Sequence, residues 1–475
     1  MSEEIKADIC VIGAGSAGLS VAAGAAQMGA RTVLIEGHKM GGDCLNTGCV
    51  PSKSLLAAAK AAQSVRTAGR FGITAADSHS DFVGVYDYVH SVIDAIAPHD
   101  SVERFTGLGC RVIEARAAFS DPRTVVAGDS IVRARRFVIA TGSRPFVASI
   151  PGLEKVTYFT NETIFDNKVL PSHLIVIGAG PIGCEMAQAH RRLGSRVTIL
   201  DLARMLPKDD PEAVEVVRQT FRAEGIETAE TVKVVRVEKS TDGISLTLNE
   251  GGTERRIEGS HLLVATGRQA NVHDLGLDRA GVKCTFQGVE VDARLRTANK
   301  RIFAAGDVIG GLQFTHAASY HAGIVLRNAL FRLPAKNAPR AMPWVTYTDP
   351  ELAHVGLTEA EAREGHGETI RILRAEFARN DRAQAEGHRE GLLKAVVSKR
   401  GRILGATIVG PQAGELILPW VLALSKGLKI GDMASVIAPY PTLGEISKRA
   451  AGNYFTPILF SNRTKWLVRF LGAFG

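Results

Sequence analysis

Two cysteines stand in a glycine-rich stretch near the N-terminus, and their spacing suits reversible redox chemistry. Cys44 and Cys49 lie five positions apart within residues 40–53, which read MGGDCLNTGCVPSK. Such a pair can close a small disulfide ring and open it again. A thiolate near a helix N-terminus is stabilised by the helix dipole and by free N–H groups. Buried structural cysteines beside a helix start would show the same spacing, so the pair alone leaves both interpretations open.

A helix is expected to begin beside the second cysteine. Ser52 is a suitable N-cap for an alanine- and leucine-rich helix that runs to about Val65. Lys53 adds a positive charge within one turn of the cysteines. Asp43 places a negative charge next to Cys44, and we expect it to raise the pKa of that thiol.

A strand–turn–helix unit at the N-terminus is predicted to position this stretch. Strand 7–12 is followed by Gly13, Gly15 and Gly18, then by a helix and a second strand that ends at Glu36. The three glycines allow a tight turn, close approach of the backbone to a pyrophosphate, and helix–strand packing. The acid is suited to ribose hydroxyls, so the unit is predicted to bind a dinucleotide.

The same pattern recurs at residues 173–201. Its glycines and its acid are Gly178, Gly180, Gly183 and Asp201, with the same separation between the last glycine and the acid. Two such units predict two nucleotides, most simply one FAD and one nicotinamide dinucleotide. A carboxylate at Asp201 favours NAD because it repels a 2′-phosphate, while Arg204 nearby keeps NADP open.

The cysteine stretch resembles the redox-active segment of the flavin-dependent pyridine nucleotide–disulfide oxidoreductases, the family of lipoamide dehydrogenase, glutathione reductase and mercuric reductase. Asp43 departs from the threonine that is common at that place. The resemblance covers nearly the whole chain, and its motifs fall in family order. It implies that the first unit holds FAD and the second NAD(P)H. It also implies that Cys49 faces the flavin and that Cys44 exchanges electrons with the substrate.

The resemblance implies an α/β fold with two Rossmann-like dinucleotide-binding domains and a C-terminal α+β interface domain. The expected FAD-binding domain is discontinuous, with its first part at 1–150 and its second at 273–340. The NAD(P)-binding domain at 151–272 is inserted in it, and a dimerisation domain follows at 341–475. Short strands in the last domain fit an antiparallel sheet. The family forms two-fold dimers in which each active site borrows residues from the other chain.

Further site residues are implied by the same resemblance. Lys53 and Glu185 are expected to form an ion pair beside the flavin ring. Two Ala-Thr-Gly segments, which contain Thr141, Gly142 and Gly267, are expected to close the two nucleotide domains.

Two more residues are expected at the flavin. Asp307, at the end of segment 297–307, would bind the ribityl or pyrophosphate end of FAD. A helix from Thr315 would point its N-terminus at the flavin pyrimidine and stabilise negative charge there. His316 is either a flavin contact or only a helix-start residue.

The sequence departs from the family at residues 438–445, which read APYPTLGE. Disulfide reductases of this family usually carry His-Pro-Thr with a Glu five positions after the His. Here Tyr440 stands at the His position and Glu445 is retained. A phenol with a pKa near 10 is a poor base at pH 7. Mercuric reductases also carry Tyr there, but they end in a cysteine pair, and no cysteine follows Cys284 in this chain.

The composition is that of an ordinary globular protein, with 45% hydrophobic and 22% charged residues in 475. Six cysteines in this length do not form a disulfide framework. We expect no secretory signal, no membrane-spanning helix and no resident metal, and therefore a cytoplasmic location. The net charge of +8 is attributed to an arginine-rich surface and to nucleotide binding, not to nucleic acid.

The C-terminal residues 462–474 form a predicted basic amphipathic helix. It carries apolar residues at Trp466, Leu467, Phe470, Leu471 and Phe474 and basic residues at Arg463, Lys465 and Arg469. Such a helix suits a peripheral membrane contact or a docking contact in a larger complex. A tail packed on the dimer is the alternative.

The predicted function is that of a homodimeric FAD enzyme, similar to dihydrolipoamide dehydrogenase, that passes two electrons between NAD(P)H, flavin and the Cys44–Cys49 pair. Its substrate would be a small-molecule or protein-bound disulfide or dithiol. Three alternatives stay open: mercuric-reductase-like reduction of a soft metal ion, reduction of a quinone or other diffusible acceptor, and service as a flavoprotein component of a larger complex.

Overall fold

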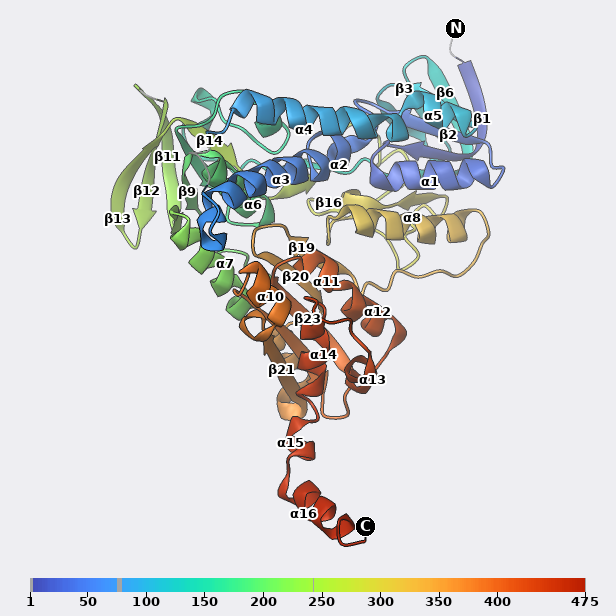
Figure 1. Cartoon of the computed structure of the whole chain (residues 1–475). Coiled ribbons are helices and arrows are strands. Elements are labelled where there is room, and N and C mark those ends of the chain that lie inside the picture. Colours follow the sequence, from blue (N-terminus) through green and yellow to red (C-terminus); the bar gives the residue numbers. More distant parts are fainter. Residues whose placement is uncertain (1–2, 75–78, 242, 475) are drawn as a thin grey trace. The chain divides into compact units, whose positions relative to one another are not determined.

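The computed structural model describes residues 3–74, 79–241 and 243–474, which divide into two compact units (Figure 1). Unit 1 comprises Met1–Leu202 and Thr231–Ala338, and unit 2 comprises Ala203–Glu230 and Pro339–Gly475. The expected boundaries of the four domain segments stay a prediction. Residues 203–230, which we expected within the nucleotide domain 151–272, group with the C-terminal residues instead.

The main sheet of unit 1 contains the strands of the first predicted dinucleotide-binding unit. Its strands run in the order β3-β2-β1-β6-β5-β4, and β18 pairs with β6. The bounds are β1 Glu3–Ile12, β2 Thr32–Glu36, β3 Cys110–Glu114, β4 Ala117–Asp121, β5 Thr124–Ala127, β6 Ser130–Ile139 and β18 Ile302–Ala304. Strands β3, β2, β1, β6 and β18 pair in parallel with one another, whereas β5 pairs antiparallel with both β6 and β4. Because β18 joins β6, the chain returns to the first sheet after the second nucleotide unit.

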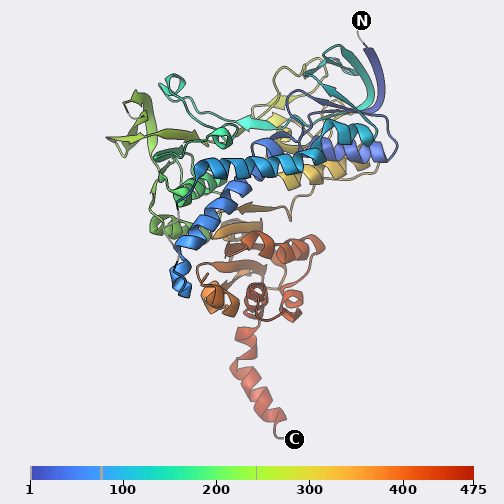
Figure 2. The same ribbon diagram turned by 45° about the horizontal axis from the view of Figure 1, so that its top comes forward.

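Helices cover this sheet and supply the N-termini of the site. Their bounds are α1 Ser16–Gln27, α2 Gly42–Asn46, α3 Cys49–Arg66, α4 Phe82–Ile96, α5 Val102–Gly107 and α8 Thr315–Ala329. Helices α1 and α8 pack side by side (Figure 2). A side chain at Gly24 of α1 would meet the Leu326 side chain of α8 at 2.6 Å, so their contact is tight.

The second parallel sheet of unit 1 contains β9, β8 and β14 in that order. The bounds are β8 His173–Ile177, β9 Arg196–Leu200 and β14 His261–Val264, with α6 Pro181–Leu193 between β8 and β9. An antiparallel sheet of β11 Lys233–Ser240, β12 Gly243–Glu250 and β13 Thr253–Gly259 is attached. Short strands β7 Ser143–Pro145 and β15 Arg268–Ala270 pair with each other, and β16 Cys284–Thr285 pairs with β17 Gly288–Val289.

Unit 2 is built on an antiparallel sheet in the order β19-β20-β23-β22-β21, as predicted for the C-terminal region. Its strands are β19 Pro343–Thr346, β20 Glu351–Gly356, β21 Ile370–Glu376, β22 Leu392–Ser398 and β23 Ile403–Gly410, and β10 is Ile226–Ala229. Its helices are α7 Pro211–Ala223, α9 Glu359–His366, α10 Asp381–Glu386, α11 Ala413–Leu416, α12 Leu418–Lys426, α13 Ile430–Ser435, α14 Glu445–Gly452, α15 Thr456–Leu459 and α16 Asn462–Leu471. Phe377 and Trp420 are fully buried in its apolar core.

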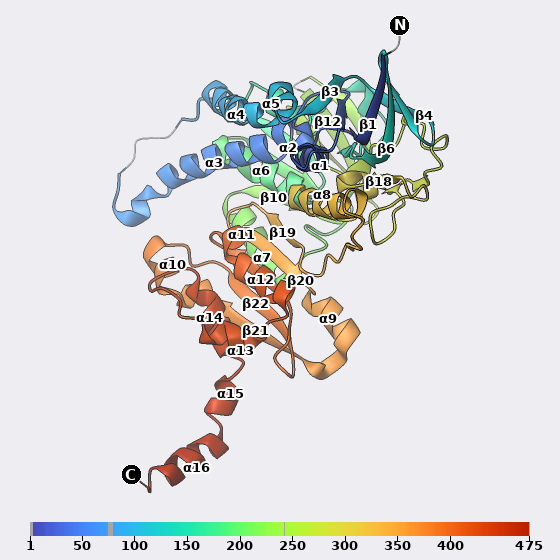
Figure 3. The same cartoon turned by 90° about the vertical axis from the view of Figure 1, so that its right-hand side faces the viewer.

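The predicted C-terminal helix is present as α16, which follows α15 at the end of the chain (Figure 3). All ten residues of α16 are described, and none of them is buried. Within the described ranges, no helix is both long and apolar enough to traverse a bilayer.

One buried lysine explains why residues 203–230 belong to unit 2. Lys394 Nζ lies 2.8 Å from Asp210, 3.0 Å from Glu212 and 2.6 Å from Glu359. Burial lowers the pKa of Lys394, but hydrogen bonds to the three carboxylates outweigh it, and the pKa is raised overall. Arg374 adds a second cation 3.0 Å from Glu212. The start of α7 is therefore held to β22 by compensated charge.

Replacing Lys394 by Met is expected to lower the free energy of unfolding by about 3–5 kcal/mol, because buried Asp210 loses its cation and two partly exposed carboxylates lose theirs. Urea denaturation measures the change. The matched control, Lys399→Met, removes an exposed lysine from the end of the same strand region and is expected to change stability by less than about 0.5 kcal/mol. Equal stability of the two variants would contradict the role of the cluster.

Candidate active site

The two cysteines stand on consecutive short helical segments. Cys44 lies within α2, and Cys49 is the first residue of α3, whose N-cap is Gly48. The prediction that Ser52 caps this helix is wrong: the N-cap lies four residues earlier, at Gly48, and buried Ser52 donates a hydrogen bond to the Cys49 carbonyl at 3.3 Å. The backbone of Gly48 turns the chain without a capping side chain. As a result Cys49 is nearer the helix N-terminus than predicted, where the dipole favours a thiolate.

Two glycines bring this redox turn onto the first nucleotide fingerprint. Gly41 and Gly42 have positive φ angles of 85° and 59°, which favour glycine. A Cβ on Gly42 would lie 2.7 Å from the Gly15 Cα, and the Gly41 N–H donates to the Ala14 carbonyl at 3.0 Å. Side chains at these positions would separate the turn from the nucleotide site.

Both fingerprints have the predicted strand–turn–helix geometry. Gly13 and Gly178 have φ angles of 102° and 113°. A Cβ on Gly18 would lie 1.8 Å from the Gly13 carbonyl oxygen, and one on Gly183 would lie 1.9 Å from the Gly178 oxygen. These four glycines are therefore required by packing within the protein.

The middle glycine of each fingerprint is not explained by that packing. A Cβ on Gly15 would have only the Gly42 Cα within 4 Å, at 3.9 Å, and one on Gly180 would meet no described atom within 4 Å. Both residues are N-caps, of α1 and α6, and neither provides a side-chain cap to its helix. Such a cradle suits a pyrophosphate, and FAD and a nicotinamide dinucleotide fit these two sites.

The acidic residues of the two predicted nucleotide-binding motifs, Glu36 and Asp201, have the same placement. Glu36 accepts a hydrogen bond from the Ala14 N–H at 2.6 Å, and Asp201 accepts one from the Ala179 N–H at 2.5 Å. Each carboxylate thus lies at the fingerprint, where a ribose would come. Arg204 is exposed.

The two cysteines form no disulfide in this structure, and their pKa values are shifted in opposite directions. A hydrogen bond from Cys44 lowers the pKa of Cys49 to about 6, helped by Thr315 and by the charge of Lys53. The Cys49 sulfur lies 3.5 Å from the Thr315 hydroxyl. The pKa of Cys44 is raised, mainly because it is the hydrogen-bond partner of Cys49 and is partly buried, and the charge of Asp43 adds to this as predicted. The reduced pair therefore favours one thiolate, on Cys49.

The predicted ion pair between Lys53 and Glu185 is confirmed. Lys53 Nζ lies 2.8 Å from Glu185 Oε2, and the Glu185 side chain is only 6% exposed. Glu185 is in the first turns of α6 and Lys53 in the first turns of α3, so the pair joins the two nucleotide units. Its position beside a flavin ring stays a proposal.

Asp43 is the centre of a second polar network that joins four segments of unit 1. Arg268 lies 3.1 Å from Asp43 and 3.8 Å from Asp307, and it donates to the Ser143 hydroxyl at 2.8 Å. Ser143 in turn donates to Asp307 at 2.7 Å. Burial raises the pKa of Asp307, while the Ser143 hydrogen bond and the Arg268 charge oppose that rise. Asn161 also donates to Asp43, at 3.1 Å.

The two Ala-Thr-Gly segments are linked to each other. The Thr141 hydroxyl donates to the Asn271 carbonyl at 2.7 Å, and the Asn271 N–H donates to the Gly142 carbonyl at 3.0 Å. The Phe146 N–H donates to the Gly267 carbonyl at 2.9 Å. Gly142 and Gly267 have positive φ angles, and a Cβ on either would meet no described atom within 4 Å. Their predicted roles in cofactor binding stay proposals.

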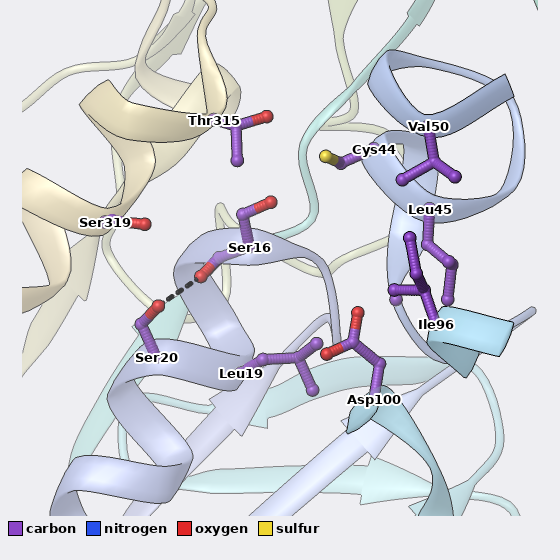
Figure 4. A pocket seen from close by; sticks show the side chains of 11 residues that line it. Ser16, Leu19, Ser20, Cys44, Leu45, Val50, Ile96, Asp100, Thr315 and Ser319 are labelled. Atoms are coloured by element: carbon purple, nitrogen blue, oxygen red, sulfur yellow. Dashed lines mark hydrogen bonds between the residues drawn. The ribbon is translucent and has the colours of Figure 1, made fainter. Parts of the chain in front are cut away.

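A cavity of about 210 Å³ opens beside the redox pair (Figure 4). Ser16 at the start of α1, Cys44, and Thr315 at the start of α8 line it. The Cys44 sulfur is directed toward the other two side chains across the open space. The space thus runs from the redox cysteine to the N-termini of two helices, which carry the partial positive charge suited to an anionic ligand.

His316 lies on the exposed side of the start of α8, where its ring stacks on Phe314 with centroids 5.3 Å apart. The structure therefore leaves its role open between the two interpretations. Within the described residues, no cluster of three or more His, Cys, Asp or Glu side chains is arranged to hold a metal ion.

Tyr440 belongs to unit 2 and is exposed. Its hydroxyl donates to Asp381 at 2.9 Å, and this bond and the Asp381 charge raise the pKa of the phenol. Tyr440 therefore holds its proton more firmly than an isolated tyrosine, so less phenolate is available to accept a proton near pH 7. Glu445 accepts a 3.4 Å hydrogen bond from the Thr442 N–H, so the retained acid orders this loop.

Sequence reasoning missed three residues that shape these sites, Ser143, Arg268 and Asp381, and it expected Thr315 only as a helix start, not as a partner of Cys49. Arg268 directly follows a recognised Ala-Thr-Gly segment, and its charge complements Asp43, so that signal was available. Asp381 is distant in sequence from Tyr440, and only the fold brings the two together.

Comparison with known proteins identifies the family. A family model described as pyridine nucleotide-disulphide oxidoreductase matches residues 7–322, and the dimerisation domain of the same family matches residues 342–451. This chain belongs to the pyridine nucleotide–disulphide oxidoreductases. The predicted fold class, enzyme class and cofactors are confirmed at that level, because members of the family use FAD and NAD(P)H. The dimerisation domain supports a homodimer.

Individual relatives divide between two activities. A mercuric reductase of Streptomyces lividans is 35% identical over 460 residues, which cover 95% of this chain and 97% of that protein. A dihydrolipoyl dehydrogenase of Geobacillus stearothermophilus is 35% identical over 462 residues, which cover 94% and 96%. The Cu(II) complex of the HOCl-induced flavoprotein disulfide reductase RclA from Escherichia coli superposes with a TM-score of 0.84, at 27% identity and with 94% and 99% of the two chains covered.

Alkylation of Cys49 by iodoacetamide is expected to follow a thiolate with a pKa near 6. We would measure it by peptide mass spectrometry in a Cys44→Ser holoenzyme, in which a hydroxyl replaces the Cys44 hydrogen-bond donor. The rate should rise through about pH 6 as the thiolate forms. Lys53→Met should move the midpoint to higher pH because it removes a cation that favours the thiolate, and Glu185→Gln should move it lower. Exposed Cys284 is the internal control, and a midpoint shared with it would contradict the assignment.

Proposed function

We propose that this chain is an NAD(P)H-dependent reductase that sends electron pairs through Cys44 and Cys49 to a disulfide acceptor. The single observation that supports this most is the pairing of a low-pKa thiol with a high-pKa thiol beside the Lys53–Glu185 ion pair. A purely structural cysteine pair needs neither a stabilised thiolate nor a buried ion pair close to it.

The electrons balance as two-electron steps. FAD, when bound, would take a hydride from NAD(P)H and pass the electron pair to the Cys44–Cys49 disulfide. Cys44, once reduced, attacks one sulfur of the substrate disulfide and releases the first substrate thiol. Cys49 then attacks the Cys44 sulfur, which releases the second substrate thiol and restores the Cys44–Cys49 disulfide. Each released thiolate takes up one proton.

The other site residues orient this exchange. Thr315 and Lys53 hold Cys49 as a thiolate, and Gly41 and Gly42 hold the turn against the fingerprint that would bind FAD. Glu36, Thr141, Gly142 and Asp307 are proposed for the FAD site, and Asp201 and Gly267 for the nicotinamide dinucleotide site. The Asp201 carboxylate favours NADH over NADPH. A cytoplasmic location stays a prediction.

A soft metal ion is the second candidate acceptor, and Tyr440 is the observation that favours it. Reduction of a disulfide substrate produces two substrate thiolates, which need protons. Reduction of a metal ion to the metal produces no substrate thiolate. Asp381 raises the pKa of Tyr440, so this residue does not replace an imidazole near pH 7. A mercuric reductase is among the relatives, but no cysteine follows Cys284 in this chain.

Anaerobic titration of the holoenzyme with NADH tests the proposed path. A long-wavelength thiolate-to-flavin absorption band is expected at two electrons per flavin, from the Cys49 thiolate. Cys44→Ser is expected to lower turnover with a disulfide at least about a hundredfold while leaving NADH oxidation by a quinone within about twofold. Simple bleaching of the flavin without that band, or full disulfide turnover by the variant, would remove the cysteines from the mechanism.

Changing Tyr440 to His separates the two acceptors. With Glu445 present, an imidazole is expected to raise kcat/KM for dihydrolipoamide oxidation by about a hundredfold near pH 8, because it can accept the thiol proton. Tyr440→Phe, the matched control, should give no such gain. Parallel assays of NADH oxidation with Hg(II) measure turnover with the metal ion. Wild-type dihydrolipoamide turnover equal to that of Tyr440→His would contradict the need for a base at this position.

A further inference from the structure

The C-terminal tail, residues 456–474, lies outside the part of the chain that the family explains. The match to the dimerisation domain ends at residue 451. Asn453 and Tyr454 are still tied to unit 2 by hydrogen bonds to the carbonyls of Arg374 and Lys399. Beyond them, the hydrogen bonds found for the described tail residues join the tail only to itself and to residues 452 and 455.

Helix α16 exposes a continuous aromatic row. Trp466 and Phe470 stack with centroids 5.4 Å apart, and Phe474 meets Phe470 edge-on at 5.1 Å. Trp466 and Phe470 are spaced by four and share one face of the helix, and Phe474, three residues beyond its end at Leu471, continues the row. Trp466 is 65% exposed and Phe474 76%. Leu467 and Leu471 widen the same face, and both are exposed.

A helix as short as α16 is expected to be stable only when its apolar face is buried against another surface. Ser461 caps it by accepting a hydrogen bond from the Thr464 N–H at 3.2 Å, so its start is locally specified. Isolated helices shorter than about 12–15 residues are marginal in water, and their stability comes from burying an apolar face. The ten residues of α16 span about 15 Å, which is half of a bilayer core, so the helix can lie on a membrane but not cross it.

The positive charge of the tail favours an anionic membrane surface as its binding partner. Arg463, Lys465 and Arg469 are its charged side chains, and the sequence from 446 to 475 contains no acidic residue. Lys465 and Arg469 each precede a member of the aromatic row by one position, so they flank it. Two copies of the tail packed on each other would bring like charges together. Anionic headgroups would instead neutralise them while the tryptophan occupies the interface.

We infer that the tail is an interfacial anchor that binds the enzyme to anionic phospholipid surfaces through the aromatic face of α16 and its flanking basic residues. The dimerisation domain places two tails on each dimer, so two short anchors would act together and raise the overall affinity. An enzyme held there would meet acceptors at the membrane surface.

Co-sedimentation of the full-length holoenzyme with vesicles tests the anchor. Vesicles of phosphatidylcholine with roughly a third phosphatidylglycerol are expected to bind it about a hundredfold more strongly than pure phosphatidylcholine, since each of the three basic side chains contributes about a factor of five at an anionic surface. Binding should weaken steeply with salt. Failure of the wild-type enzyme to bind the anionic vesicles overturns the inference.

Variants of the tail locate the contact. Lys465→Glu with Arg469→Glu, and separately Trp466→Ser with Phe470→Ser, should each reduce binding at least tenfold. Arg123→Glu with Lys283→Glu is the matched control, because it makes the same charge change at exposed positions of unit 1 and should reduce binding by less than about twofold. Binding retained by both tail variants overturns the inference.

Two further readouts exclude other occupants of the helix face. Turnover with NADH and size-exclusion elution should be unchanged in the tail variants. A variant that dissociates to monomers would show that the tail packs on the partner subunit, and the inference would fall. Tryptophan emission should shift to the blue on anionic vesicles in the wild-type enzyme but not in Trp466→Phe, although two other tryptophans remain.

Discussion

The close approach of two glycines is the constraint on which the site of this enzyme depends. Gly42 lies so near Gly15 that a single added carbon would meet backbone at 2.7 Å. Because neither residue has a side chain, the turn that carries Cys44 rests on the loop that would hold a pyrophosphate. Redox sulfur and cofactor loop are thus placed by backbone contact, and the Gly41–Ala14 hydrogen bond fixes their register.

Ion pairs also hold the segments of the site together. Lys53 and Glu185 join the first helices of the two nucleotide units, while Arg268 joins Asp43 to Asp307. Asp43 departs from the usual residue of the family and would repel a thiolate on Cys44. Its pairing with Arg268 compensates the carboxylate, and the negative charge still favours Cys49 as the thiolate. The departure therefore reinforces the asymmetry of the two sulfurs.

Unit 2 matches the family in its dimerisation domain but differs from the usual family sequence at Tyr440. The dimerisation domain of the family matches this region, and Lys394 binds the start of α7 to the antiparallel sheet through Asp210 and Glu212 and also contacts Glu359 of α9. The loop that usually supplies an imidazole carries Tyr440, whose hydroxyl is bonded to Asp381. The structure thus has a hydrogen-bonded phenol at the position where the resemblance implies an imidazole.

Local patterns determined much of this protein. The buried strands, the glycine turns and the C-terminal helix were predictable, because each depends on short-range periodicity or on a motif with one steric solution. The ion pair of Lys53 with Glu185 was expected only from the resemblance to the family. Tertiary structure alone decided where the helix of Cys49 begins, which cation meets Asp43, that Asp381 binds Tyr440, and that residues 203–230 pack with the C-terminal unit. The physical reason is distance along the chain: a hydrogen bond or an ion pair between residues 59 to 225 positions apart leaves no periodic trace, and it forms only once the sheets have brought both partners to one place.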